Sequence, residues 1–419
     1  MRSMTVWLCL CVFGMAQGNG LKMLIDHAQK HNGQIRAKEI TVTAKSKEIE
    51  AAESAYWPTV DIGAYYSRYS PSYVVAPGEE TTGFAKMNFE LYDGGRKEAT
   101  IQAKTYEKEA SLFEKEAFKK SVTLQIVQHY YGIKGMEASL HALEERAKEL
   151  KAQIARVRKF LATGLTTQEE VDKLLAVYEN NRYSMENTRL AITTHKENLR
   201  LITGIKQMQL GRNYFLEPKR VKFEWFDPIK QLEARLNAVG ESAHAIEAAN
   251  MPQVSLSDTY FQSNFSDSPS MPALPGIGGD GFLVDHQNEL KLSVNMRLFD
   301  HGRVSKESEA VRYQKLSLMS ELEHAKRQQR MNYRLAKETL KTTKAKIQSA
   351  KSALKAAEST YVTIRKKFEA GLVDDIAYLD ALAQKTLAQA RYKETVYDYE
   401  VKKSVYYYYA GKDPKEFIR

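Results

Sequence analysis

Apolar and polar side chains alternate strictly along one segment near residue 290. Every second position there is apolar: Leu290, Leu292, Val294, Met296 and Leu298. The residues between them are charged or polar, and a period of two is typical of a β-strand, so we predict a strand over 288–299. The same pattern predicts strands through 60–66, 87–91 and 254–256, with loops at 69–83 and 266–286.

Helical periodicity dominates the rest of the chain. Residues 96–161 and 303–368 contain almost no Pro or Gly, the two residues that interrupt helices. A helix of this size is about 100 Å long, which few globular helices approach. Shorter helices are expected over 21–56 and 229–250, and returning helices are expected to end at Thr203 and near Tyr409.

Two parts of the chain repeat each other at an offset of 207 residues, as from Leu91 to Leu298. LYDGGR at 91–96 recurs as LFDHGR at 298–303. Gly164-Leu165 recurs as Gly371-Leu372, and Gly204 as Gly411. A repeat of this length is a duplicated half-domain rather than a short solenoid module.

The repeated motif joins a strand to a long helix. In such a junction Asp can cap the new helix and Gly permits the sharp turn. The predicted strand–helix junctions are therefore formed by Asp93, Gly95 and Arg96, and by Asp300, Gly302 and Arg303.

The repeat also sets the predicted domain organisation. Residues 1–18 have a basic start, an apolar stretch and a small-residue end, which is typical of a secretory signal peptide. Both cysteines, Cys9 and Cys11, fall inside it, so no disulfide or thiol site is expected in the mature chain. We predict a first repeat at 19–204, a linker at 205–227, a second repeat at 228–411 and a tail at 412–419.

The composition disfavours two other classes of protein. The net charge of +10 is spread among Glu on helical faces, which favours a solvated helix surface over a nucleic-acid site. The sequence at 276–281 matches GxGxxG by letter, but it follows a Pro-rich loop and leads into a strand, so no dinucleotide site is expected.

The histidine pair and the tyrosine run predict no catalytic, cofactor or metal site either. His27 and His31 are spaced for one helical face, yet a third metal ligand is not evident in the sequence. The tyrosines at 406–409 are interpreted as packing at a helix end.

Four strands in one chain cannot close a barrel. A core-packed sheet face gives the same alternation as a lipid-facing one, but the predicted helices are too long and polar to cover these strands. Membrane barrels need at least eight strands, because an open edge in lipid leaves backbone groups unpaired. We therefore expect a shared barrel of 8, 12 or 16 strands from two, three or four chains.

The junctions, the tip sequences ATGLT and EAGLV, and Leu379-Asp380-Ala381 together resemble the TolC-like outer-membrane factors. The resemblance implies a mainly α chain with duplicated helical hairpins and four strands. It implies a homotrimer with a 12-stranded β-barrel in the outer membrane and a 12-helix α-barrel in the periplasm. It also implies that the linker and the tail form an equatorial collar.

The resemblance extends to a periplasmic entrance lined by carboxylates. Asp380 matches one such aspartate of the family and Glu170 an acidic closing partner, with Asp374 and Asp375 nearby. Ala377, Phe368 and Val373 depart from the family pattern, which leaves the closing contacts undefined. A solvated acidic helix start explains the same carboxylates, whereas a ring of them would favour cations.

The tips Gly164-Leu165 and Gly371-Leu372 are expected to dock a periplasmic adaptor protein, although a plain hairpin turn also explains the glycines. The leading prediction is a passive exit duct that works with an adaptor and an inner-membrane pump, in drug efflux, metal efflux or type I secretion. A non-conducting coiled-coil surface protein is the alternative. A periplasmic adaptor would need a β-rich lipoyl-like domain, for which the sequence shows no segment.

Overall fold

A computed structural model describes residues 20–73, 77–206, 210–218, 221–266 and 283–419. The predicted signal peptide at 1–18 and the glycine-rich sequence at 276–281 lie outside these residues.

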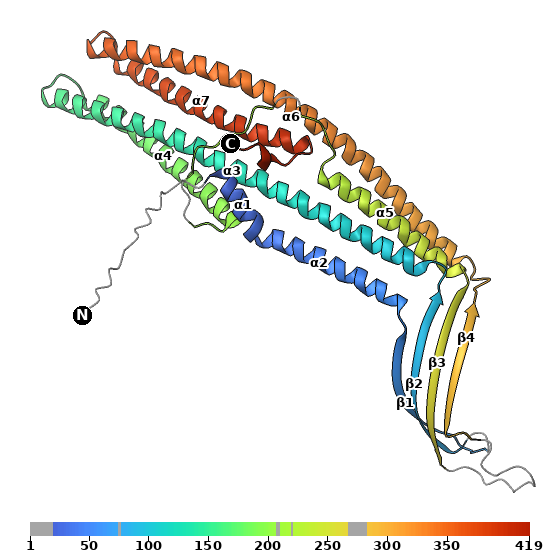
Figure 1. Cartoon of the computed structure of the whole chain (residues 1–419). Coiled ribbons are helices and arrows are strands. Elements are labelled where there is room, and N and C mark those ends of the chain that lie inside the picture. The colour runs from blue at the N-terminus through green and yellow to red at the C-terminus, as the bar shows by residue number, and fades with distance from the viewer. Residues whose placement is uncertain (1–19, 74–76, 207–209, 219–220, 267–282) are drawn as a thin grey trace, which may run out of the picture. The chain divides into compact units, whose positions relative to one another are not determined.

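The elements follow the two repeats in the same order (Figure 1). The first copy holds α1 (Leu21–His31), α2 (Gly33–Glu53), η1 (Ser54–Tyr56), β1 (Thr59–Arg68), β2 (Glu79–Tyr92), α3 (Arg96–Ala162) and α4 (Gln168–Thr203). The second holds α5 (Asp227–Glu247), η2 (Ala248–Asn250), β3 (Gln253–Ser266), β4 (His286–Asn295), α6 (Arg303–Glu369) and α7 (Asp375–Tyr409), and the tail holds η3 (Pro414–Phe417). The predicted fold class, mainly helical with duplicated long hairpins and four strands, is confirmed.

The two long helices, α3 and α6, have the same length of 67 residues each. That length corresponds to about 100 Å. Gly204, with φ 75°, ends α4 in the left-handed conformation.

The helix predicted over 21–56 is wrong in one detail, because Asn32 divides it. The backbone of Asn32 is extended, and its Oδ1 accepts hydrogen bonds from the N–H groups of Gln34 (2.9 Å) and Ile35 (3.2 Å). The Asn32 amide also donates to the carbonyl oxygen of Ile202 (2.9 Å). Asn32 therefore caps a second helix instead of continuing the first.

Two strand limits also differ from the prediction. The strand predicted to reach residue 299 ends at Asn295, which pairs with Gln253, the first residue of β3. Beyond that pair lies Pro252, which has no N–H to donate, and residues 296–299 have no partner strand among the described residues. Conversely, β2 begins at Glu79, inside the predicted loop, because residues 79–83 pair with strands on both sides.

The chain divides into two compact units that cut across the repeats. The tip unit takes residues up to Glu39, Glu114–Pro228 and Ala325–Arg419. The sheet unit takes Ile40–Phe113 and Ile229–His324. The repeat boundaries at 19–204 and 228–411 remain a prediction about the duplication.

The core of the tip unit lies where α1, α3, α4 and α7 meet. Its largest fully buried side chains include Tyr130, Tyr407 and Phe215. Phe215 pairs with Ile418 in an antiparallel bridge, and the ring of Phe417 stacks on Tyr407 at 3.7 Å. The predicted linker and tail therefore pack on each other here, and the tyrosine run begins with two buried side chains, as expected for packing at a helix end.

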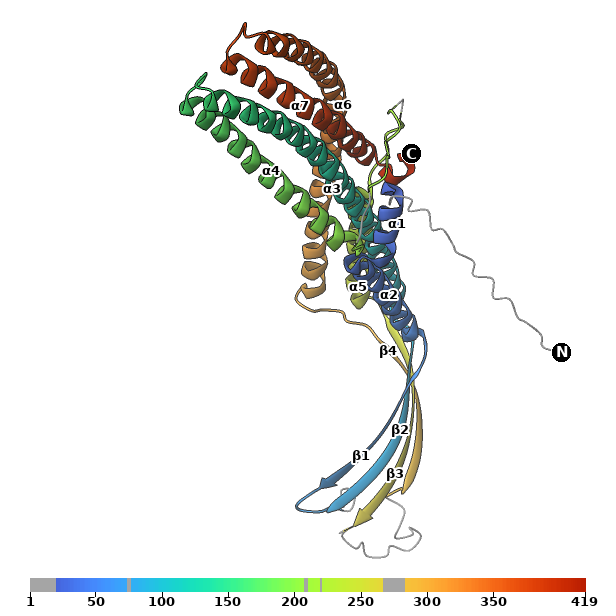
Figure 2. The same cartoon turned by 90° about the vertical axis from the view of Figure 1, so that its left-hand side faces the viewer.

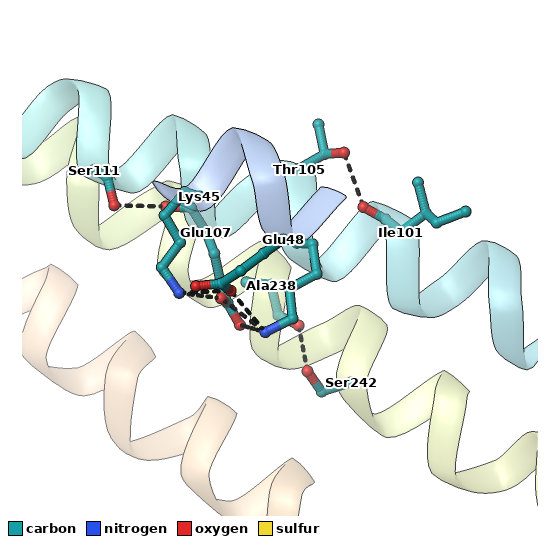
Figure 3. Close-up of polar contacts among 9 residues, drawn as sticks. Lys45, Glu48, Ile101, Thr105, Glu107, Ser111, Ala238 and Ser242 are labelled. Atoms are coloured by element: carbon teal, nitrogen blue, oxygen red, sulfur yellow. Dashed lines mark hydrogen bonds and ion pairs between the residues drawn. The ribbon is translucent and has the colours of Figure 1, made fainter. Parts of the chain in front are cut away.

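The sheet unit contains one four-stranded antiparallel sheet in the order β1-β2-β3-β4, which is visibly curved (Figure 2). Beside it, α2 and α3 are joined by an ion-pair network (Figure 3). Lys45 lies 2.9 Å from both Glu48 and Glu107, and Lys104 lies 3.3 and 3.2 Å from the same two carboxylates. Each ammonium group thus contacts both carboxylates.

Within the described ranges, no helix combines the length and the apolar character needed to cross a membrane.

Candidate functional site

At the first strand–helix junction, the Asp93 side chain caps the start of α3. Asp93 Oδ1 accepts from the N–H of Gly95 (3.2 Å) and Oδ2 from the N–H of Lys97 (2.9 Å). Gly94 and Gly95 have φ of 74° and 90°, where a side chain would be strained. Arg96 then pairs with Glu90 of β2 at 3.1 Å.

The second junction repeats this geometry. Asp300 accepts hydrogen bonds from the N–H groups of Gly302 (2.9 Å) and Val304 (3.0 Å). These bonds hold the pKa of Asp300 below its ordinary value, and the bond from Val304 has the largest effect. His301 has a positive φ of 56° at the position that corresponds to Gly94 in the first junction. Arg303 pairs with Glu307 of its own helix (3.0 Å), so only the capping role is common to both copies.

The sheet leaves both of its edge strands open. Among the described residues, β1 pairs only with β2, and β4 pairs only with β3. Each edge therefore presents a row of backbone N–H and C=O groups without a partner strand, over ten residues in each case.

The two faces of the sheet differ sharply in polarity. We call apolar face the side that carries Val60, Ile62, Met87, Phe89, Leu256, Leu290, Leu292 and Val294. Asp258 interrupts it between Met87 and Leu290. Ile62 is 85% exposed and Leu292 is 65% exposed, so no core formed by the described residues packs on this face.

The opposite side, the polar face, carries hydrogen-bonding and charged residues near the junctions. These are Thr59, Asp61, Lys86, Asn88, Ser257, Thr259, Glu289 and Lys291. An apolar outer face and a polar inner face are typical of strands in an outer-membrane barrel.

The hairpin tips close in the same way in both repeats. Leu165 N–H donates to the carbonyl of Phe160 (2.9 Å), and Leu372 N–H donates to that of Lys367 (2.8 Å). Gly164 and Gly371 have φ of 75° and 73°, as a Schellman-type helix end requires. The geometry leaves both leucines exposed, at 75% and 74%.

A groove of about 420 Å³ lies between the two tips. It is lined by Leu165 and Glu170 of the first hairpin and by Gly371, Asp374 and Asp375 of the second, among others. Three of the four predicted entrance carboxylates thus come together there. Asp380, the fourth, lies outside the groove and is exposed on α7.

The carboxylates of the groove differ in environment. Asp374 caps α7 by accepting from the N–H of Ala377 (2.9 Å). Glu170 faces Lys173 at 3.4 Å. The pKa of Asp375 is raised by burial and by the Glu170 carboxylate, while Arg156 opposes the shift.

Arg156 is a groove residue that the sequence analysis did not single out. Its guanidinium lies over the ring of Phe160 (5.4 Å) and over that of Phe368 (5.3 Å), which joins the two hairpins through cation–π contacts. Phe368 in turn stacks on Tyr378 at 4.8 Å. The available signal was the i, i+4 spacing of Arg156 and Phe160 one turn before the tip.

The titration of Asp375 gives a prediction about pH. Because its folded-state pKa lies above the unfolded value, its contribution to stability is complete below the unfolded pKa and is lost as pH rises through the folded one. Asp375→Asn should therefore slow amide hydrogen exchange at residues 371–378 at neutral pH, with no difference at about pH 3. An equal effect at both pH values would show that ionisation is not the cause.

His27 and His31 form no metal site with other described residues. Their rings lie 4.3 Å apart, and His27 Nδ1 bonds the carbonyl oxygen of Thr203 (2.7 Å). Among the described residues, no three His, Cys, Asp or Glu side chains are grouped to hold a metal ion.

Comparison with protein families identifies a match over most of the chain. The family model described as outer membrane efflux protein matches residues 24–205 and 228–405. Comparison with curated protein sequences finds no relative.

Solved structures share the fold at low sequence identity. The outer membrane protein VceC from Vibrio cholerae is 16% identical with a TM-score of 0.79, covering 94% of this chain and 96% of that one. The CmeC outer membrane channel of Campylobacter jejuni is 15% identical with a TM-score of 0.80, covering 93% and 85%. The open state of the MtrE outer membrane channel of Neisseria gonorrhoeae is 14% identical with a TM-score of 0.76, covering 94% and 89%.

Proposed function

Because this chain belongs to the outer membrane efflux protein family, we propose that three copies of it form a passive exit duct. The family resides in the outer membrane, with a long helical part in the periplasm. In the proposed trimer, the sheets join into a 12-stranded barrel and the helices into a 12-helix cylinder, with 205–227 and 412–419 as a collar outside it.

The open sheet is the observation that carries this proposal. A four-stranded sheet with two open edges and an exposed apolar face is not stable alone in lipid, where every backbone group needs a partner. Pairing β1 of one copy with β4 of the next satisfies both edges and turns the apolar face toward lipid.

The exposed leucines of the two tips support the remaining part of the proposal. We assign Leu165 and Leu372 to docking of a periplasmic adaptor protein, which connects the duct to an inner-membrane pump. The pump supplies the energy and selects the cargo, whether small toxic compounds or a secreted polypeptide.

Conductance is the direct test of the duct. The detergent-purified trimer, added to a planar lipid bilayer, should give discrete single-channel currents. A trimer that inserts without conducting would instead support the coiled-coil surface protein.

Asp380 has a testable role at the periplasmic entrance. Three copies of an inward carboxylate would form a ring that favours cations. Asp380→Asn should therefore reduce the cation-to-anion permeability ratio in a salt gradient. Glu394→Gln, an exposed carboxylate change further along α7, should leave the ratio unchanged. Identical reversal potentials for Asp380→Asn and wild type would show that Asp380 does not line the periplasmic entrance.

A further inference from the structure

A row of two phenylalanines crosses the polar face of the sheet, and Phe265 of β3 lies further along the same face, opposite Glu80. Phe84 of β2 pairs directly with Phe261 of β3, and Gly63 and Gln287 complete the row across the four strands. The ring centroids of Phe84 and Phe261 lie 6.4 Å apart at an interplanar angle of 50°. This tilted arrangement is within the range of a favourable aromatic pair.

Gly63 fixes one of the two rings against the sheet. A Cβ at position 63 would lie 2.5 Å from Cζ of Phe84, so the ring of Phe84 extends across the glycine. Covering a strand glycine with a cross-strand aromatic ring stabilises the pairing, which explains Phe84 structurally. It gives no reason for Phe261, whose partner on the next strand is Gln287.

Polar rows border the aromatic pair on both sides. Toward the junctions lies the row Asp61, Lys86, Thr259 and Glu289. Toward the opposite end, Thr82 bonds Ser263 (2.7 Å) and Glu80 (2.8 Å), and Tyr65 also donates to Glu80 (2.9 Å). The pair is therefore an apolar row between two rows that carry polar groups, and Phe265 lies beyond the second of these rows.

We propose that Phe84 and Phe261 line the inside of the barrel as an apolar collar that binds planar aromatic cargo during passage. The inference rests on the proposed trimer, in which the polar face borders the lumen. Three copies bring six rings into the pore. Neighbouring strands of a barrel are staggered by only about 3 Å along its axis, so the rings lie near one level.

The chemistry of the collar selects for aromatic and cationic surfaces. A ring face attracts another ring by offset stacking and attracts a cation by its quadrupole. Small hydrated ions have no such contact and would pass between the rings. The collar would therefore lengthen the stay of a planar aromatic cation without stopping ion flow.

Current block by ethidium, a planar aromatic cation, measures this binding in single-channel recordings. The double variant Phe84→Ala/Phe261→Ala should shorten the blocked dwell time about three- to tenfold and keep the open-channel current. Phe84→Leu/Phe261→Leu, which keeps apolar bulk without rings, should also shorten it. Thr259→Ala, on the same face, is the matched control and should match wild type.

Thiol labelling separates failure of the collar from failure of the duct. Outside the predicted signal peptide at 1–18 the sequence has no cysteine, so Phe84→Cys and Ile62→Cys each give a single thiol once that peptide is removed. A membrane-impermeant reagent should label Phe84→Cys and leave Ile62→Cys unlabelled. If Phe84→Cys were labelled but the Phe84→Ala/Phe261→Ala variant kept the wild-type ethidium dwell time, the apolar collar would be contradicted and the proposed duct would not. If only Ile62→Cys were labelled, the apolar face would be the one in contact with water. This result would contradict both the apolar collar and the proposed duct.

Discussion

Leu292→Arg is expected to lower the yield of trimer in the outer membrane severely. Leu292 lies near the middle of the apolar face, opposite Leu256 in β3, and is 65% exposed in the single chain. A cation on the lipid side of a barrel costs about 2–4 kcal/mol near the bilayer midplane. The proposed trimer multiplies this cost by three. Heat-modifiable trimer bands from isolated outer membranes measure the effect.

Ser293→Arg is the matched control for that variant. Ser293 is the next residue of β4 and belongs to the polar face, which already carries Lys291 two residues away. The same added charge should then be tolerated, because a lumen side chain stays in water. Equal trimer yields for the two variants would show that the sheet has no lipid-facing side of the kind proposed.

Replacing both tip leucines with aspartate should abolish docking of the adaptor while trimers still form. Leu165 and Leu372 are the exposed apolar residues of two turns with the same geometry, at 75% and 74% exposure. If each leucine is a hot spot of the interface, its loss costs about 2 kcal/mol or more, which is more than roughly tenfold in affinity. Crosslinking to the adaptor in whole cells is the measurement.

A charge control distinguishes the loss of the leucines from added charge. Thr163→Asp and Ala370→Asp place a carboxylate beside each tip glycine and keep both leucines. These residues are exposed and precede Gly164 and Gly371. If the control variants also lose the crosslink, the tip tolerates no charge and the leucines have no specific role. Unchanged crosslinking of the leucine variants would refute docking at the tips.

The long elements could be predicted because their signals are local. The near absence of Pro and Gly between Arg303 and Phe368 predicted α6 to within one residue of its end at Glu369. The Asp–Gly junction motifs predicted both helix starts, because an aspartate needs only the next few N–H groups to cap a helix.

The remaining features depend on partners that are distant in the chain. The break at Asn32 depends on the carbonyl of Ile202, 170 residues away. The end of β4 is set by where β3 begins, and the pairing of β2 with β3 joins the two repeats. Arg156 gains its role only when Phe368 of the other hairpin is beside it. None of these contacts leaves a periodic trace in the sequence.

The mass of the native particle in detergent tests the central claim most directly, namely that one chain supplies only part of a barrel wall. Native mass spectrometry should find three chains per particle, with the backbone amides of β1 and β4 protected from hydrogen exchange. A stable particle of one chain with both edge strands protected would contradict the account.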